Sequence, residues 1–244
     1  MRIKRALIAG GAALVLLAVL LLLPLPGGDA GWAANTTVTA HTGAFDTEDN
    51  SLWNFQAVLA CPGIDIVEAD LRFFDGAPMF AHGRKLPSAP VTPEHLFIMV
   101  AGTGRGVNLD LKNTRGDMEG LSRLAEKYGL EGSVFLTGVY PYFLPVARRS
   151  GLPYYYEATP FYSFSPLVNR AVCAFAKRAG AMGLNISYKF CTEKLVNTAH
   201  RAGLRISVWT VDDEDAMRRV LALGVDNITS RYPDTVRSLL EEKP

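Results

Sequence analysis

The chain has almost no net charge, since 25 lysine and arginine residues stand against 24 aspartate and glutamate residues in a length of 244. A balanced composition creates no long-range field of one sign over the surface. We therefore expect no nucleic-acid partner and no capture of acidic polymers by overall charge.

Cysteine is scarce as well. Cys61, Cys173 and Cys191 form no C-x-x-C pair, and no histidine stands at zinc-site spacing from them, so a thiolate metal site is not supported. Cys173 and Cys191 would form a disulfide only in an oxidising compartment. The favoured interpretation is that they are small buried hydrophobic side chains.

The phosphate loops of nucleotide-binding proteins are missing from the sequence. No G-x-G-x-x-G follows the first expected strand, and no G-x-x-x-x-G-K-[ST] occurs. The glycine-rich stretch AGTGRG at 101–106 precedes a strand and is typical of a turn. These absences argue against a nucleotide-binding open sheet.

The N-terminal segment differs from the rest of the chain. MRIKR supplies three cationic side chains, and Ala6–Leu23 then runs for 18 residues without a charged or polar side chain. Such a run is long for a signal-peptide core and just long enough to span a bilayer. We expect an uncleaved membrane anchor or a signal peptide at 1–26, the anchor being favoured, and a linker at 27–35.

The charge of this segment also predicts where the domain lies. Positive residues before an apolar span stay in the cytoplasm, so the domain at 36–244 is expected on the outer side of the membrane. It would be secreted if residues 1–34 were removed.

From residue 36 on, short β-branched or aromatic runs alternate with longer stretches of helical period. Eight strands each followed by a helix predict a parallel sheet closed as a single (β/α)8 TIM barrel, whose active site lies where the strands end. An open, doubly wound sheet is the alternative. The expected strands are at 37–41, 65–71, 106–112, 133–139, 153–158, 183–188, 205–211 and 226–230.

Charged residues share one side of the second and third expected strands. Because side chains alternate along a strand, Glu68, Asp70 and Arg72 face one way, as do Asp110 and Lys112. An exposed edge strand with a salt bridge would also explain the first group. In a barrel the three carboxylates would meet and form an all-oxygen site suited to one Mg²⁺ or Ca²⁺ ion.

Two histidines flank this acidic group, His41 at the end of the first strand and His82 after the second. A divalent ion and Lys112 would offset the charge of a phosphate while the imidazoles move protons or attack phosphorus, a combination that indicates phosphoryl transfer. His95 and His200 fall in expected helices and are interpreted as surface or packing residues. Other polar residues close later strands, namely Glu157, Tyr188, Lys189 and Trp209.

Taken in order, seven short motifs resemble those of the glycerophosphodiester phosphodiesterases, a family within the PLC-like phosphodiesterase TIM barrels. The resemblance runs from about Thr37 to Asp234. The motifs are AHTG, EDNSL, VEADLRFFDG, FAHG, LDLKN, VWTVDDEDAM and LGVDNITSRYPD.

The resemblance implies a metal-dependent enzyme that splits a glycerophosphodiester into glycerol 3-phosphate and an alcohol. A small diester, a lysophospholipid or a polyglycerolphosphate is the implied substrate class. It also implies a role for each site residue. His41 and His82 are the general acid/base pair, and Glu68, Asp70 and Asp110 are the ligands of one divalent ion. Lys112 contacts the phosphate, and Trp209 lines the site.

Two positions depart from the family's pattern. Thr42 stands where the family has a phosphate-binding arginine, and Gly83 stands where an aspartate follows the second histidine. Because Thr42 offers only a hydroxyl, Arg72 is expected to supply the guanidinium to the substrate. Asn50 either holds the loop after His41, which is favoured, or contacts phosphate.

Nine Tyr or Phe residues lie between Tyr140 and Phe164. Rings at a barrel mouth would bind the alcohol moiety or rest at a membrane interface, although packing explains at least half of them.

Other functions stay open. Asp110, where the family more often has glutamate, favours a phospholipase of the sphingomyelinase D, lysophospholipase D or phosphatidylinositol type. The loss of arginine at position 42 favours a barrel without turnover that serves as a surface binding module. Direct hydrolysis and a cyclic phosphate route both fit the sequence, which sets no oligomeric state.

Overall fold

The computed structural model describes residues 36–158 and 165–242. Its centre is a closed barrel of eight parallel strands, in which β1 pairs with β9 on one side and with β2 on the other. This closure confirms the predicted (β/α)8 barrel and excludes the open sheet. The strands of the barrel are β1 (Thr37–Ala40), β2 (Ile66–Phe74), β4 (Gly106–Leu111), β5 (Val134–Val139), β6 (Tyr154–Glu157), β7 (Gly183–Ser187), β8 (Arg205–Trp209) and β9 (Asn227–Ser230).

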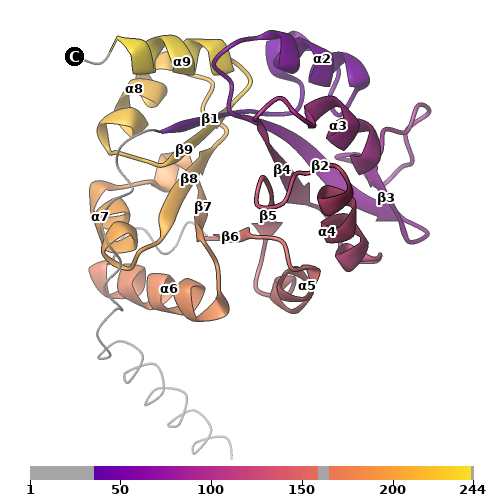
Figure 1. Cartoon of the computed structure of the whole chain (residues 1–244). Coiled ribbons are helices and arrows are strands. Elements are labelled where there is room, and N and C mark those ends of the chain that lie inside the picture. Colours follow the sequence, from indigo (N-terminus) through magenta and orange to yellow (C-terminus); the bar gives the residue numbers. More distant parts are fainter. Residues whose placement is uncertain (1–35, 159–164, 243–244) are drawn as a thin grey trace, which may run out of the picture.

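Helices surround the strands on the outside (Figure 1). Each barrel strand is followed by at least one of them before the next barrel strand begins. In chain order they are η1 (Ala44–Asp46), α2 (Leu52–Ala60), α3 (Pro93–Val100), α4 (Met118–Lys127), α5 (Leu144–Ser150), α6 (Pro166–Ala179), η3 (Tyr188–Phe190), α7 (Glu193–Arg201), α8 (Glu214–Ala222) and α9 (Pro233–Glu241).

Local sequence explains where these helices begin and which side they bury. In α7 the N-cap Thr192 accepts a hydrogen bond from the backbone N–H of Leu195. Leu195, Val196 and Ala199 then recur at the spacing of one helical face and are buried against the barrel. Proline at the first helical position, as at Pro93 of α3, also favours a helix start because its fixed φ is that of a helix.

The two sides of the barrel strands have different chemistry. Alternate residues such as Val67, Ala69 and Leu71 of β2 pack outward into the apolar core beneath the helices. The inner side is polar and buried, and its side chains bond one another: the Asn227 amide accepts from Thr39 and donates to Ser207. The interior below the carboxyl ends of the strands is therefore a hydrogen-bonded layer, in which buried polar groups have partners.

One strand was not expected from the sequence. β3 (Ala77–Phe80) pairs antiparallel with the end of β2 and forms a hairpin. Asp75 and Gly76 at its turn both have positive φ, 48° and 85°, as a two-residue hairpin turn requires. β2 consequently extends beyond the ring of the barrel.

The expected anchor at 1–26 and the linker at 27–35 lie outside the described residues. Within 36–158 and 165–242, none of the helices has both the length and the apolar character of a membrane span. Cys173 and Cys191 are buried free thiols, as the favoured interpretation had it.

Candidate active site

A pocket of about 500 Å³ lies at the carboxyl ends of the barrel strands, where the barrel architecture predicts a site. It gathers residues that are far apart in the sequence. Those predicted from the sequence are His41, Glu68, His82, Asp110, Lys112 and Trp209, and all of them line the pocket. Asp70 lies just beneath, with 1% of its side chain exposed.

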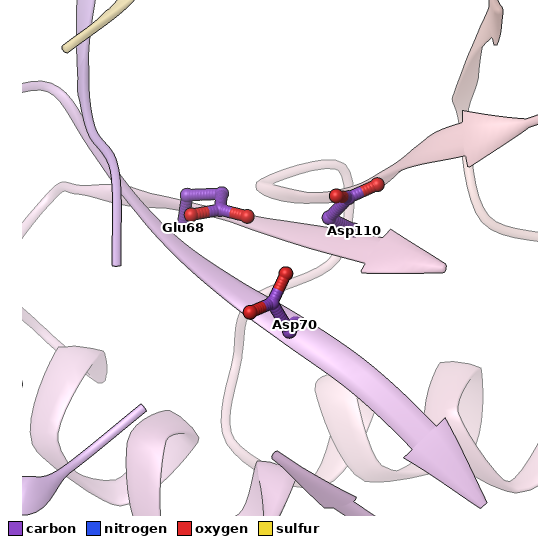
Figure 2. A group of neighbouring side chains, drawn as sticks. All are labelled: Glu68, Asp70 and Asp110. Carbon is purple, nitrogen blue, oxygen red and sulfur yellow. The ribbon is translucent and has the colours of Figure 1, made fainter. Parts of the chain in front are cut away.

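Three carboxylates come together from two neighbouring strands (Figure 2). Glu68 and Asp70 lie on β2, and the pairing of β2 with β4 places Asp110 directly beside Asp70. One oxygen from each carboxylate lies within 4.8 Å of the others. Oxygen ligands at this spacing fit a hard divalent cation.

The electrostatics of the group fit a cation too. Burial, together with the charges of Asp70 and Asp110, raises the pKa of Glu68 well above its usual value. The Glu68 Oε1 atom accepts no hydrogen bond from any residue that the structure describes, whereas Oε2 accepts from the backbone N–H of Thr42 at 2.7 Å. The site thus holds surplus negative charge and an open carboxylate oxygen, both of which an ion would use.

Lys112 partly balances these acids. Its Nζ lies 2.8 Å from Asp70 Oδ1 and 2.5 Å from Asp110 Oδ2. Burial disfavours the ammonium, but the two carboxylates outweigh burial and raise the pKa of Lys112. Lys112 also holds the pKa of Asp70 below its usual value against the opposing effect of burial. The lysine is therefore a fixed positive charge at the edge of the acidic group.

Asn50 and Thr42 orient the acids instead of lining the pocket. The Asn50 amide donates to Asp70 Oδ2 at 2.9 Å and accepts from the Asp70 backbone N–H at 2.8 Å. The backbone N–H of Asn50 in turn donates to the Thr42 hydroxyl at 2.5 Å. The loop after His41 is thereby tied to β2, and a hydrogen bond from Asn50 holds the Asp70 carboxylate.

Gly138 makes room for Asp110. The pairing of β5 with β6 shifts register between Leu136 and Val139, and Gly138 has a φ of 65° at this irregularity. A Cβ atom at this position would overlap Asp110 Oδ1. Glycine is required here because the carboxylate occupies the space of a side chain.

The two histidines have their rings fixed through Nδ1. His41 Nδ1 lies 2.6 Å from the carbonyl oxygen of Thr42, and since a carbonyl only accepts, Nδ1 carries the hydrogen and Nε2 is the basic nitrogen. His82 Nδ1 lies 3.3 Å from Asp70 Oδ2, which assigns its Nδ1–H in the same way. The side chain of His82 is 73% exposed, so this ring stands at the open side of the site.

A third buried acid lies on the far wall of the pocket. Glu157, at the end of β6, accepts from the Asn185 amide at 2.9 Å and from Trp209 Nε1–H at 3.2 Å. Burial raises the pKa of Glu157 to about 8, so it is mostly a neutral acid at pH 7. The hydrogen bond to Glu157 holds the indole of Trp209 at the mouth of the pocket.

Comparison with known proteins finds a similar family for part of the chain. The model of the glycerophosphoryl diester phosphodiesterase family matches residues 155–235. Glycerophosphodiester phosphodiesterase GDPD4 of Arabidopsis thaliana is 35% identical over 63 residues, which are 26% of this chain and 19% of that protein. The carboxyl-terminal third of the barrel is thus similar to the glycerophosphoryl diester phosphodiesterase family, and the chain spans about a fifth of the length of this curated relative.

Solved structures share the fold of this chain. One from Silicibacter pomeroyi, assigned as a glycerophosphoryl diester phosphodiesterase, has a TM-score of 0.70 and 20% identity over 91% of this chain and 97% of its own. A phosphodiesterase from Oleispira antarctica, solved with the product sn-glycerol-3-phosphate, has a TM-score of 0.66 and 17% identity over 85% and 97% of the two chains.

Three of the residues singled out from the sequence lie elsewhere. Arg72 is not part of the pocket lining; it borders a separate hollow that shares Lys112 with the pocket. Its Nη2 donates to the carbonyl oxygen of His82 at 3.0 Å. Tyr188 and Lys189 belong to η3, outside the pocket lining, where the ammonium of Lys189 stacks on the Tyr188 ring. Strand alternation predicts the side of β2 on which Arg72 lies, but not that β2 extends beyond the barrel there, which takes Arg72 out of the pocket lining.

Sequence reasoning missed Asp49 and Arg231, which both line the pocket. Arg231 follows the last residue of β9, and the pairing of β1 with β9 sets it next to His41. Its guanidinium lies 3.5 Å from Asp212 Oδ2, while its backbone N–H donates to Asp212 Oδ1 at 2.8 Å. The rule that strand ends carry the site would have found Arg231 had it been applied to the eighth barrel strand.

The aromatic stretch divides as expected between packing and the pocket. Tyr154, Tyr155 and Tyr156 are buried in β6. Tyr140 and Tyr142 stack with parallel rings at 5.6 Å and line the pocket together with Phe143. Phe161, Tyr162 and Phe164 lie outside the described residues.

Proposed function

We propose that the protein is a metal-dependent phosphodiesterase that hydrolyses glycerophosphodiesters to glycerol 3-phosphate and an alcohol. The observation that carries the proposal is the meeting of Glu68, Asp70 and Asp110 within 4.8 Å, at a pocket that two imidazoles and a lysine also line. The family match at 155–235 and the product found in the Oleispira antarctica phosphodiesterase support the same reaction.

The three carboxylates would hold one Mg²⁺ or Ca²⁺ ion, which when bound supplies positive charge to the phosphate oxygens. Lys112 adds a second positive charge at the same edge. Together they offset the charge that a pentacoordinate phosphorus accumulates.

The two histidines would transfer the protons. Water adds its oxygen to phosphorus and gives a proton to one imidazole at Nε2, while the bond from phosphorus to the alcohol oxygen breaks and that oxygen takes a proton from the other imidazole. The Nδ1 contacts of His41 and His82 leave Nε2 as the reacting nitrogen in each ring.

Arg231, in our proposal, supplies the guanidinium that position 42 lacks. The hydroxyl of Thr42 is buried and accepts from Asn50, so it is not available to a ligand. Arg231 lines the pocket on the strand beside β1, and Asp212 orients it. A guanidinium suits the two free oxygens of a phosphodiester because it donates in a fork.

The test is turnover of a substrate panel by the purified full chain, with chelator and with Mg²⁺ or Ca²⁺ restored. The panel holds glycerophosphocholine, glycerophosphoethanolamine, glycerophosphoglycerol, lysophosphatidylcholine and sphingomyelin. We expect glycerol 3-phosphate from the first three and none after chelation. Choline release from sphingomyelin without any glycerol 3-phosphate would make the protein a phospholipase of the sphingomyelinase D type. No turnover with any ion would favour the binding module.

We further propose, on the sequence of residues 1–26 alone, that the domain is held on or released from the outer side of a membrane. Digestion of intact cells by an added protease should remove the domain. Full protection until the cells are lysed would contradict this topology.

A further inference from the structure

A second hollow, of about 640 Å³, opens beside the active-site pocket. Its charged lining consists of Arg72, Arg84, Arg115 and Lys112, with Asp75 as the one acid among the residues described there. We call it the basic hollow. Since Lys112 also lines the active-site pocket, the two cavities adjoin.

The three arginines of the basic hollow are not neutralised by carboxylates of the described part of the chain, whereas Lys112 pairs with Asp70 and Asp110. None of the three arginines forms an ion pair there, in contrast to Arg218 and Arg237, which pair with nearby carboxylates on the outer surface. The Arg72 guanidinium donates to the carbonyl of His82, and its buried Nε–H has no acceptor among the described residues. A buried donor without a partner is costly, so an acceptor from outside the chain would be stabilising.

The side chain of Asn113 connects two of the segments that line the hollow. The Asn113 side chain accepts from the N–H of Phe73 at 3.0 Å and donates to its carbonyl at 3.1 Å, where β4 has already ended and no strand pairs with this edge of β2. This amide fixes the loop that carries Arg115 against the strand that carries Arg72. The backbone segments that carry these two cations are therefore held together without a ligand.

The position of the hollow sets the spacing between two ligands. Arg72 follows the metal ligand Asp70 by two residues on the same strand, a rise of roughly 7 Å. Two phosphates joined through one glycerol are separated by a three-carbon bridge with an ester oxygen at each end, which spans a comparable distance. A phosphate next in line to the reacting one would reach the arginines.

We propose that the basic hollow binds a second phosphate of the substrate, so that the enzyme favours glycerophosphodiesters with a neighbouring phosphate over those with one phosphate. This inference rests on the proposed function. The second phosphate would come from the next unit of a glycerol phosphate chain or from a phosphorylated head group, since the arginines recognise the anion in either.

The test compares kcat/KM for three substrates: glycerophosphoglycerol, a chain of three glycerols joined by two phosphodiesters, and glycerophosphoinositol 4-phosphate. We expect the wild type to favour one or both two-phosphate substrates. Arg84→Gln and Arg115→Gln should each lower the ratio of two-phosphate to one-phosphate kcat/KM by about tenfold. Arg201→Gln, an exposed arginine at the end of α7 on the opposite side of the barrel, should leave the ratio unchanged.

The outcomes separate this inference from the reaction itself. A ratio that stays constant in both variants, or falls equally in Arg201→Gln, overturns the basic hollow while leaving the phosphodiesterase intact. If the wild type cleaves none of the substrates, the proposed function fails, and calorimetric binding of the two-phosphate chain decides the hollow: weaker binding by the two variants supports it, and binding equal to the wild type overturns it. The substrate that shows the preference identifies the source of the phosphate.

Discussion

The barrel before residue 155 and the part from 155 to 235 differ in what they contribute. The family model matches only the second part, yet the proposed ligands, proton donors and lysine all lie in the first. Motif residues of the second part are largely structural. Asp226, for instance, accepts from the Ile206 backbone at 2.7 Å and from His200 at 2.8 Å, and Pro233 begins α9.

The comparison teaches that the family match and the proposed chemistry lie in different residues here. The second part closes the barrel and buries its core, so its sequence is constrained by packing. The first part carries the charges, and it is also where Thr42 and Gly83 depart from the family's pattern. Similarity in the second part alone does not transfer an active site, and the geometry of the first part is needed to argue one.

The largest expected effect concerns the first part. Asp70→Asn should lower kcat/KM for a glycerophosphodiester by about 10³-fold, since it removes a charge that both the ion and Lys112 use. Steady-state kinetics and calorimetric titration of Mg²⁺ check this, and unchanged kinetics would remove the metal site from the proposal.

The matched part should respond in the opposite way. Asp226→Ala should lower the free energy of unfolding by about 3 kcal/mol, because the Ile206 N–H and the His200 ring lose a buried acceptor. Turnover per folded molecule should stay close to that of the wild type. Urea denaturation followed by circular dichroism measures the first quantity; a stable variant with lost turnover would break the comparison.

Arg231 is the residue of the matched part that we expect to act on substrate. Arg231→Gln should lower kcat/KM by roughly 10- to 100-fold, mainly through KM, since one charged donor to phosphate is lost. Arg201→Gln is the matched control and should behave as the wild type. Equal kinetics for Arg231→Gln and the wild type would show that Arg231 does not contact the phosphate.

The smallest expected effect is a slope with pH. Burial raises the pKa of Glu157 from an ordinary 4.5 to about 8 in the metal-free protein. Between these values the folded state keeps a proton that the unfolded chain has released, so stability should fall as pH rises through this window, on the order of 1 kcal/mol per pH unit, and level off above it. Glu157→Gln should flatten the slope. Urea midpoints measured every half pH unit with chelator present compare the two proteins, and parallel curves would contradict the assignment.

Much of the fold could be predicted because strand and helix periods are local. The alternation of Glu68 with Val67 and Ala69 is visible in the sequence, as are the Thr92-Pro93 helix start and the order of the eight barrel strands. β3 was not predicted although Asp75-Gly76 is a strong hairpin turn, because the strand has only four residues and contains Pro78.

The site could be predicted only where it depends on the order of strands. The meeting of Asp70 with Asp110 follows from pairing of consecutive barrel strands, and the sequence indicates it. The position of Arg231 beside His41 depends on the pairing of the last strand with the first, and that of Arg72 depends on how far β2 extends. Neither is a property of a local window.

The sequence by itself determined the faces of the strands, the order of the elements and the identity of the acidic group, because these follow from periods of two and of 3.6 residues. The tertiary structure alone decided which charges share a cavity. The balanced net charge gives no sign of the basic hollow. Arg72, Arg84 and Arg115 come from separate segments, which the closed barrel and the hairpin bring together. Local periodicity contains no information about such long-range convergence.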